Sequence, residues 1–286
     1  MSKKTFFISL LVIVLGFGAG TAAAKRTAIF DWIDARRKPD VPVAISHDDI
    51  SNGNTSANAN INVNSNINTN SNANTNSPVN QSTSQPVNSA PSLPVEINLK
   101  VPFTSQAPTA NWDLPFQEAC EETAALMVHY YLQDKTFASK DAAETTIKEV
   151  VAFEEQHYGN YKDTTAVETA RFIKDMWGYQ TVDIYTGSQV TLERIKHELA
   201  DGNPVIVLAA GRLLGNPNYK APGPIYHALV IKGYKKNGQI ITNDPGTRKG
   251  ADYVYDPTVL MNAIHDWNGG DVDHGQKNMI VIRENN

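Results

Sequence analysis

The 286-residue sequence contains a single cysteine, Cys120, and no excess of positive charge. One cysteine excludes an internal disulfide bond. The formal net charge of −5 leaves no basic footprint, so nucleic acid is not an expected partner. The sequence also lacks the HExxH, GxSxG and P-loop motifs, which argues against a zinc peptidase, a serine hydrolase with a nucleophile elbow, and a P-loop nucleotide hydrolase.

A metal site is not indicated either. Residues 271–275 loosely follow a calcium-loop pattern, but Gly275 takes the place of a ligand and no glutamate closes the loop. The sequence carries no cofactor motif. We therefore expect a protein that works without metal or cofactor.

The N-terminus has the features of an export segment. Two lysines precede an apolar run over residues 5–24. Its length suits an uncleaved membrane anchor, whereas the small residues at 22–24 also suit a cleaved signal peptide. The positive charges after the run outnumber those before it and oppose export of the C-terminal part. We favour an extracytoplasmic domain on an anchor at residues 1–24, followed by a juxtamembrane segment at 25–50, over a secreted protein.

Residues 51–94 consist mainly of Asn, Ser and Thr, with scattered small and aliphatic residues. Asn is depleted from strands, and the segment offers no face worth burying. Nothing would therefore repay the entropy of ordering it. We predict a disordered linker between the N-terminal segment and a folded domain at residues 95–286.

Helix patterns dominate the first half of that domain, and strand patterns dominate the second. The predicted helices begin at Cys120, at Ser139, at the Thr165–Glu168 capping box, at Thr191 and at the Asp256–Pro257 pair. The predicted strands cover residues 95–101, 179–185, 204–209, 227–234, 239–244 and 277–283. Asn237–Gly238 predicts a hairpin between two of these strands. Helices followed by an antiparallel sheet indicate an α+β fold.

Cys120 lies where a proline-bearing loop gives way to the first helix. The unpaired N–H groups and the dipole of a helix N-terminus favour the nucleophilic thiolate. Glu121 and Glu122 act in the opposite direction unless they point away, and helical geometry turns at least Glu122 to another side. A free cysteine is also commonly a small buried core residue. The position alone leaves a nucleophile and a core residue as alternatives.

A cysteine hydrolase also needs an imidazole base and a group that orients it. Of the seven histidines, His227 is best placed, because it opens an apolar strand after a Gly/Pro-rich loop at residues 215–224. Asp244 ends the next strand of the same hairpin, with Asn243 beside it as an alternative orienting group. The start of one hairpin strand lies beside the end of the other. We therefore predict that His227 and Asp244 are neighbours.

Several segments together resemble the bacteriocin-processing (double-glycine) peptidases and their stand-alone bacterial relatives, which are papain-like cysteine peptidases. The segments are residues 101–106, Cys120, residues 204–207, residues 227–234 and residues 243–245. The resemblance spans about residues 95–286 and implies a papain-like fold. It also implies Cys120 as nucleophile, His227 as base, Asp244 as orienting acid, and Gln106 with the Cys120 backbone N–H as oxyanion donors.

Two positions depart from the family pattern. Glu121 follows the nucleophile, where the family commonly has glycine, and Gln106 lies farther ahead of Cys120 than usual. Gln117 is nearer to Cys120 and stays an alternative oxyanion donor. The chain shows no counterpart of the family's transporter region or nucleotide-binding domain, so we do not expect leader processing coupled to export.

The sequence thus predicts an extracytoplasmic cysteine peptidase that acts on peptides or proteins, and it carries no signal for an oligomeric state. Two other functions stay open. One is a catalytically inactive papain-like module that binds peptide or cell-wall material, for which Glu121 is the main argument. The other is an amidase or acyltransferase acting on cell-wall peptides.

Overall fold

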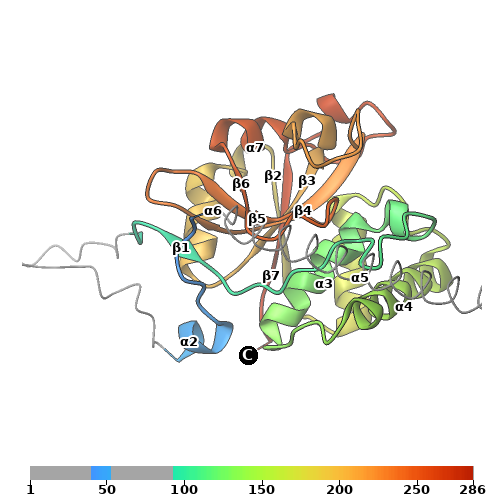
Figure 1. Ribbon diagram of the computed structural model, residues 1–286, viewed down its shortest axis with the longest axis horizontal. Helices are drawn as coiled ribbons and strands as arrows, with labels where there is room; N and C mark the ends of the chain where they lie inside the picture. The colour runs from blue at the N-terminus through green and yellow to red at the C-terminus, as the bar shows by residue number, and fades with distance from the viewer. Residues whose placement is uncertain (1–39, 53–92, 286) are drawn as a thin grey trace, which may run out of the picture. The chain divides into compact units, whose positions relative to one another are not determined.

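An antiparallel sheet and a group of helices make up the part of the chain that the computed structural model describes, residues 40–52 and 93–285 (Figure 1). The unit formed by Val41–Asn286 contains all of these elements. The anchor predicted at residues 1–24 and nearly all of the predicted linker lie outside the described residues. Among the residues that are described, no helix is both long and apolar enough to cross a membrane.

Three consecutive long helices match predicted ones. They are α3 (Cys120–Leu132), α4 (Lys140–Tyr158) and α5 (Ala166–Trp177). The side chain of Ser139 caps α4, and Thr165 forms the predicted capping box on α5. Gly178 ends α5 with φ 73°, a left-handed conformation that costs glycine little. Local sequence signals therefore fix the start of α4 and both ends of α5, whereas α3 begins without a capping side chain.

The sheet has the strand order β2-β7-β3-β4-β5-β6, with the short β1 paired to β4 off this path, and every neighbouring pair is antiparallel. The strands are β1 (Ile97–Asn98), β2 (Val182–Thr186), β3 (Val205–Ala210), β4 (Tyr226–Tyr234), β5 (Ile240–Asn243), β6 (Tyr253–Tyr255) and β7 (Asn278–Ile282). All residues of β3 and β4 are buried, as expected of strands in the middle of a sheet covered on both faces. The predicted α+β class is confirmed.

The remaining helices are α2 (His47–Ser51), α6 (Leu192–Ala200) and α7 (Pro257–Ala263). The last two begin at the predicted caps, Thr191 and Asp256. The strand predicted over residues 95–101 is shortened to β1. This strand needs the glycine opposite it, because a Cβ on Gly233 would lie 2.2 Å from the Ile97 carbonyl oxygen.

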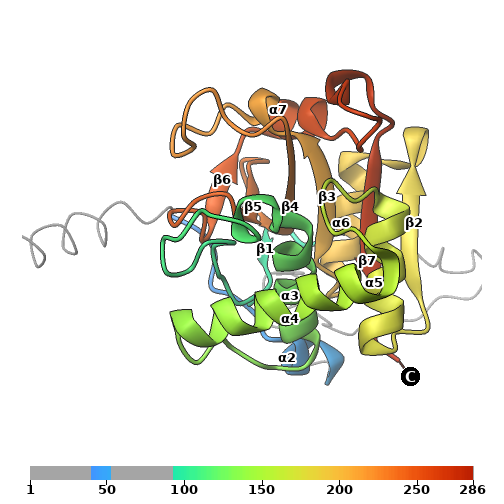
Figure 2. The same cartoon turned by 90° about the vertical axis from the view of Figure 1, so that its right-hand side faces the viewer.

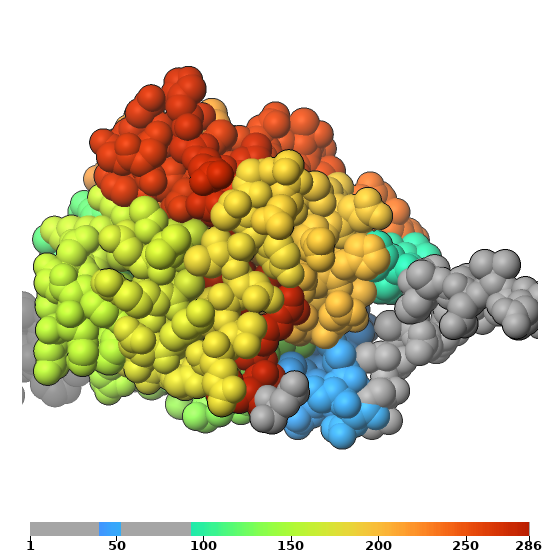
Figure 3. Space-filling view, turned by 180° about the vertical axis from the view of Figure 1, so that it is seen from behind, coloured from blue at the N-terminus to red at the C-terminus, as the bar shows by residue number. Residues whose placement is uncertain are grey.

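Residues 41–52 pack against the sheet domain, although the sequence suggested only a juxtamembrane segment there. The Ile45 N–H donates to the Asn98 carbonyl at 2.8 Å, and the Ile45 carbonyl accepts from the Lys100 N–H at 2.7 Å. His47 Nε2 lies 3.7 Å from the carboxylate of Glu284, so this segment also lies beside the end of β7 (Figure 3). Backbone hydrogen bonds therefore join the β1 region to Ile45 on one side and to β4 on the other, in place of the long strand that was predicted.

Helix α3 lies between the sheet and the other two long helices (Figure 2). It packs on β3 and β4 with one side and on α4 and α5 with the other. As a result, eleven of its residues are buried, including Glu121 and Glu122. This burial, which the sequence pattern did not indicate, sets the electrostatics at the start of the helix.

Candidate active site

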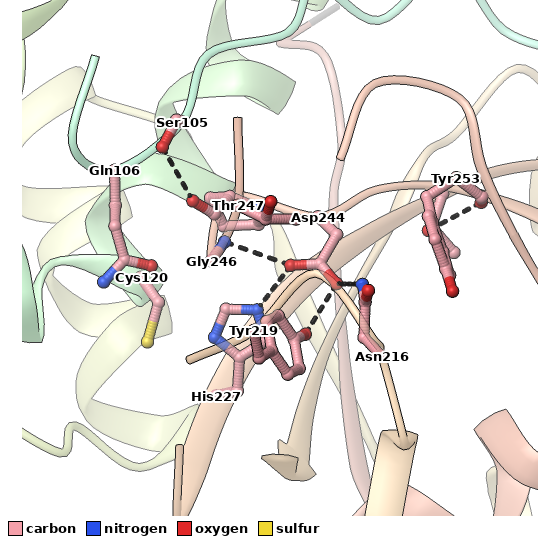
Figure 4. Close-up of polar contacts among 12 residues, drawn as sticks. Ser105, Gln106, Cys120, Asn216, Tyr219, His227, Asp244, Gly246, Thr247 and Tyr253 are labelled. Atoms are coloured by element: carbon pink, nitrogen blue, oxygen red, sulfur yellow. Dashed lines mark hydrogen bonds and ion pairs between the residues drawn. The ribbon is translucent and has the colours of Figure 1, made fainter. Parts of the chain in front are cut away.

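A cavity of about 960 Å³ opens at the N-terminus of α3 and contains the predicted site residues Cys120, His227 and Gln106. Cys120 is the first residue of α3, and His227 is the second residue of β4. Asp244 follows the last residue of β5 directly. The site therefore forms where a helix start meets one end of the β4–β5 hairpin (Figure 4).

Cys120 is only 6% exposed. Its thiol donates a hydrogen bond to Oε2 of Glu121 at 2.9 Å. Burial raises the pKa of the Cys120 thiol well above its usual value, and the Glu121 charge raises it further. The thiol is therefore protonated at neutral pH. The thiolate that the helix N-terminus favoured in the sequence analysis is not the resting state.

The carboxyl of Glu121 adds to the effect of burial on the thiol. Glu121 is 1% exposed, and its Oε2 accepts the hydrogen bond from the thiol. Burial, followed by repulsion from Glu122, raises the pKa of Glu121 well above its usual range. At the position after Cys120, this chain therefore has a carboxyl group that is hydrogen-bonded to the sulfur, in place of glycine.

Glu122 does not reach solvent, and its charge also raises the pKa of the Cys120 thiol. It is completely buried, and it faces Glu154 of α4. Both Glu122 carboxyl oxygens and Oε2 of Glu154 lack a hydrogen-bond partner. Burial raises the pKa of Glu154 to about 8. Since two adjacent buried carboxylates repel strongly, at least one of this pair holds a proton at neutral pH.

His227 and Asp244 are in direct contact. His227 Nε2 lies 2.8 Å from Oδ1 of Asp244, and both side chains are almost fully buried. The predicted neighbourhood of these two residues is thereby confirmed. An ionised carboxylate only accepts hydrogen bonds, so the proton of the neutral ring stays on Nε2. The other nitrogen, Nδ1, is left free of that proton and lies on the side of Cys120 in Figure 4.

Four further groups hold the Asp244 carboxylate. Oδ2 accepts from Asn216 at 2.9 Å and from the hydroxyls of Tyr219 and Tyr255 at 2.6 Å each, while Oδ1 accepts from the Gly246 N–H at 3.0 Å. Burial alone would raise the pKa of Asp244, but the attraction of His227 and these hydrogen bonds outweigh it and lower the pKa. Asp244 is therefore ionised and fixed in place. Asn243, the alternative orienting group, instead donates to the Val101 carbonyl at 3.0 Å.

Gly246 lets the loop after β5 close over the imidazole. A Cβ at this position would lie 2.8 Å from Cε1 of His227 and 2.9 Å from the Tyr219 ring. No larger residue fits without moving the ring. The glycine in the turn after Asp244 is thus needed for close approach, not for an unusual backbone angle.

Gln106 lines the cavity beside Cys120, but its amide is already engaged (Figure 4). Nε2 donates to the carbonyls of Phe116 and Gln117, at 2.9 and 3.1 Å, and Oε1 is buried without a partner. The alternative, Gln117, also lines the cavity and donates to Glu118 at 2.8 Å. The assignment of an oxyanion donor to either glutamine stays a prediction.

Sequence reasoning did not identify Asn216, Tyr219 and Tyr255 as members of the site. The first two come from the Gly/Pro-rich loop that was noted only as the segment before His227, and the third ends β6, a strand that was not predicted. The polar and aromatic residues of that loop were the one sequence feature that could have pointed to Asn216 and Tyr219. No sequence feature pointed to Tyr255, because its position depends on the pairing of β6 with β5.

Comparison with known proteins gives a family and two similar solved structures. A model of the Peptidase_C39 like family matches residues 98–269, more than half of the chain. A structure described as a C39-like peptidase from Bacillus anthracis is 14% identical with a TM-score of 0.43, over 67% of this chain and 99% of that one. A fragment of prointerpain A from Prevotella intermedia is 20% identical with a TM-score of 0.35, over 53% of this chain and 45% of that one. No curated protein matches the chain.

The family match agrees with the resemblance found in the sequence. Together with the helices and antiparallel sheet, it supports the predicted papain-like fold class. The roles of individual residues are a separate question.

Proposed function

Because the chain belongs to the Peptidase_C39-like family, we propose that it hydrolyses peptide bonds with Cys120 as nucleophile, His227 as base and Asp244 as the group that orients the base. One observation carries this proposal: the buried 2.8 Å contact of His227 with Asp244 lies at the same cavity as the only thiol. A histidine held in one tautomer by a carboxylate is the partner that a cysteine nucleophile requires.

The chemistry follows from the tautomer. Nδ1 of His227 takes the thiol proton as the sulfur of Cys120 attacks the carbonyl carbon of the substrate. Asp244 stabilises the imidazolium that forms, and the ring then gives its proton to the leaving amine. Water attacks the resulting thioester, with His227 again as base, and frees the acid product and the thiol. Since the thiol is protonated at rest, the proton must move during each attack.

The developing oxyanion lies near the start of α3. The first N–H groups of a helix have no partner within the helix, and the backbone N–H of Cys120 is the one nearest the sulfur. Donors fixed in this way stabilise the transition state without reorganisation. Gln106 can join them only by releasing a carbonyl, either that of Phe116 or that of Gln117.

The proposal places the reaction outside the cytoplasm, with residues 1–24 as a membrane anchor. The apolar run at residues 5–24 supports this placement. Intact cells that produce the full chain with a C-terminal tag provide the test. External protease should remove the tag from intact cells, and a tag that is cleaved only after lysis would argue for the opposite orientation.

A second candidate is a catalytically inactive module that binds peptide. The observation in its favour is the Glu121 carboxyl on the sulfur, which keeps the thiol protonated. Both candidates predict peptide binding at the cavity, but only the peptidase predicts turnover.

The test is hydrolysis of a broad library of internally quenched peptides by the full chain and by its Cys120→Ala variant. The peptidase proposal expects turnover that the substitution abolishes, with a melting temperature within about 2 °C of the wild type, since one small side chain replaces another. Peptide binding without turnover by the wild type would favour the inactive module.

A further inference from the structure

Three acidic residues from three segments line the cavity that Cys120 also lines. Glu118 ends the 3-10 helix η2 (Phe116–Glu118), Glu121 belongs to the first turn of α3, and Asp163 lies in the connection from α4 to α5. The three influence one another. Burial and then the Glu118 charge raise the pKa of Asp163, and Asp163 in turn adds to the rise at Glu121.

These carboxyls have few partners. Among the described residues, none of the three forms a salt bridge within 4.0 Å. Glu121 is 1% exposed, and its Oε1 has no hydrogen bond. The positive charge of Lys162 lowers the pKa of Asp163, but the Lys162 side chain is exposed and extends over the Tyr161 ring at 5.9 Å. A buried carboxyl oxygen without a partner costs free energy that a bound donor would recover.

The cations of the cavity lie elsewhere. Lys220 belongs to the loop before β4, and Arg248 and Lys249 belong to the loop after Gly246, so all three come from the two loops that flank His227. All three are exposed. The lining is thus acidic on the side of the helices and basic on the side of the sheet loops, and a ligand across it meets charges of opposite sign.

We propose that Glu118, Glu121 and Asp163 form a subsite for a cationic group of the substrate, an ammonium or a guanidinium, next to the bond that Cys120 attacks. This rests on the proposed function, and it names the class of substrate: peptides with a positive charge beside the scissile bond. A donor in this subsite satisfies Oε1 of Glu121 through a charge-assisted hydrogen bond. A positive charge beside Glu121 and Cys120 also favours the ionised forms of both groups, so substrate binding makes proton loss from the thiol easier.

The cation can come from two sources, a lysine or arginine side chain within a chain or the free α-amino group at a peptide end. Both are nitrogen donors with a positive charge. The two differ in whether acetylation of the peptide N-terminus removes the interaction, and this separates them experimentally.

The experiment measures binding, so that it does not depend on turnover. Full-length protein with Cys120→Ala is titrated calorimetrically with alanine-based hexapeptides, each carrying a single lysine at a successive position, with and without N-terminal acetylation. Matched peptides carry norleucine instead of lysine. The proposal expects one lysine position, or the free amine, to bind about tenfold more tightly than its neutral counterpart, which corresponds to a pairing energy of about 1.4 kcal/mol.

Variants then locate the subsite. Asp163→Asn and Glu118→Gln, added separately to Cys120→Ala, should each remove most of that preference. Asparagine suits position 163 because Asp163 has φ 50°, a region in which Asn and Asp are well tolerated. Glu193→Gln on α6 is the matched control, since this carboxyl is exposed and outside the cavity lining, and it should leave the preference unchanged.

Equal affinities of charged and neutral peptides, including no measurable binding by either, would overturn the subsite. So would a preference that survives both cavity variants. The proposed function fails separately: a charge preference in binding without hydrolysis by the wild type keeps the subsite and removes the peptidase, whereas hydrolysis without any charge preference does the reverse.

Discussion

The thiol of Cys120 donates a hydrogen bond of 2.9 Å to the carboxyl of Glu121, the next residue in the chain. This contact replaces the thiolate–imidazolium pair that a helix N-terminus would favour. The charges that act on the sulfur are those of Glu121 and Glu122, and both raise the pKa of the thiol. The sulfur that we propose as the nucleophile is therefore neutral in the free protein, and His227 and Asp244 are already in contact.

The substitution Glu121→Gln should make the thiol more reactive. Removing the charge lowers the pKa of Cys120, and one pKa unit multiplies the thiolate fraction about tenfold below the pKa. We expect iodoacetamide to label this variant about tenfold faster than the wild type at pH 7.5, measured by intact mass. Glu193→Gln is the control and should label at the wild-type rate. An unchanged rate for Glu121→Gln would mean that burial alone sets the thiol pKa.

Asp244→Asn should lower kcat by about 10³-fold with little change in KM, because an amide can favour the wrong imidazole tautomer. Asn243→Ala is the comparison. It removes the hydrogen bond to the Val101 carbonyl, so it should lower the melting temperature more than kcat. If Asn243→Ala lowers kcat and Asp244→Asn does not, Asn243 is the orienting group.

Gly246→Ala should displace the imidazole. The new methyl group would lie 2.8 Å from Cε1 of His227, closer than carbon atoms approach without strain. Steady-state kinetics should show a loss in kcat of at least about tenfold, with KM less affected. Gly238→Ala provides a control at a glycine with open space around it, where the φ of 86° strains the turn but leaves the site alone. Full activity of Gly246→Ala would show that the loop yields instead of the ring.

Some features of the site follow from the local sequence, and others depend on how the whole domain packs. The caps of α4, α5 and α7 and the hairpin that joins His227 to Asp244 follow from neighbouring residues, and sequence reasoning predicted them. The direction of Glu121 depends on α3 being enclosed by both sheet and helices, which no periodicity in the helix indicates. Tyr219 and Tyr255 reach Asp244 from a loop and from β6, so their roles appear only when the whole sheet is assembled.

The buried pair Glu122–Glu154 should make the fold less stable as the pH rises from acidic to neutral values. Glu154 has a folded pKa of about 8, above its ordinary value near 4.5, so the native state binds protons more tightly than the unfolded chain. The free energy of unfolding should therefore fall between about pH 4.5 and pH 8 and level off above. Urea unfolding across this range tests the slope, and Glu154→Gln should flatten it. A profile that is already flat in the wild type would contradict proton uptake by this pair.

The most direct measurement of the central claim is intact mass spectrometry of the full chain, acid-quenched during turnover of an activated peptide ester. The account predicts a mass increase equal to the acyl group, located on Cys120 and absent from Cys120→Ala. It also predicts that His227→Ala forms this adduct far more slowly than the wild type. Turnover that persists in Cys120→Ala, or an acyl group found on any other residue, would contradict the account.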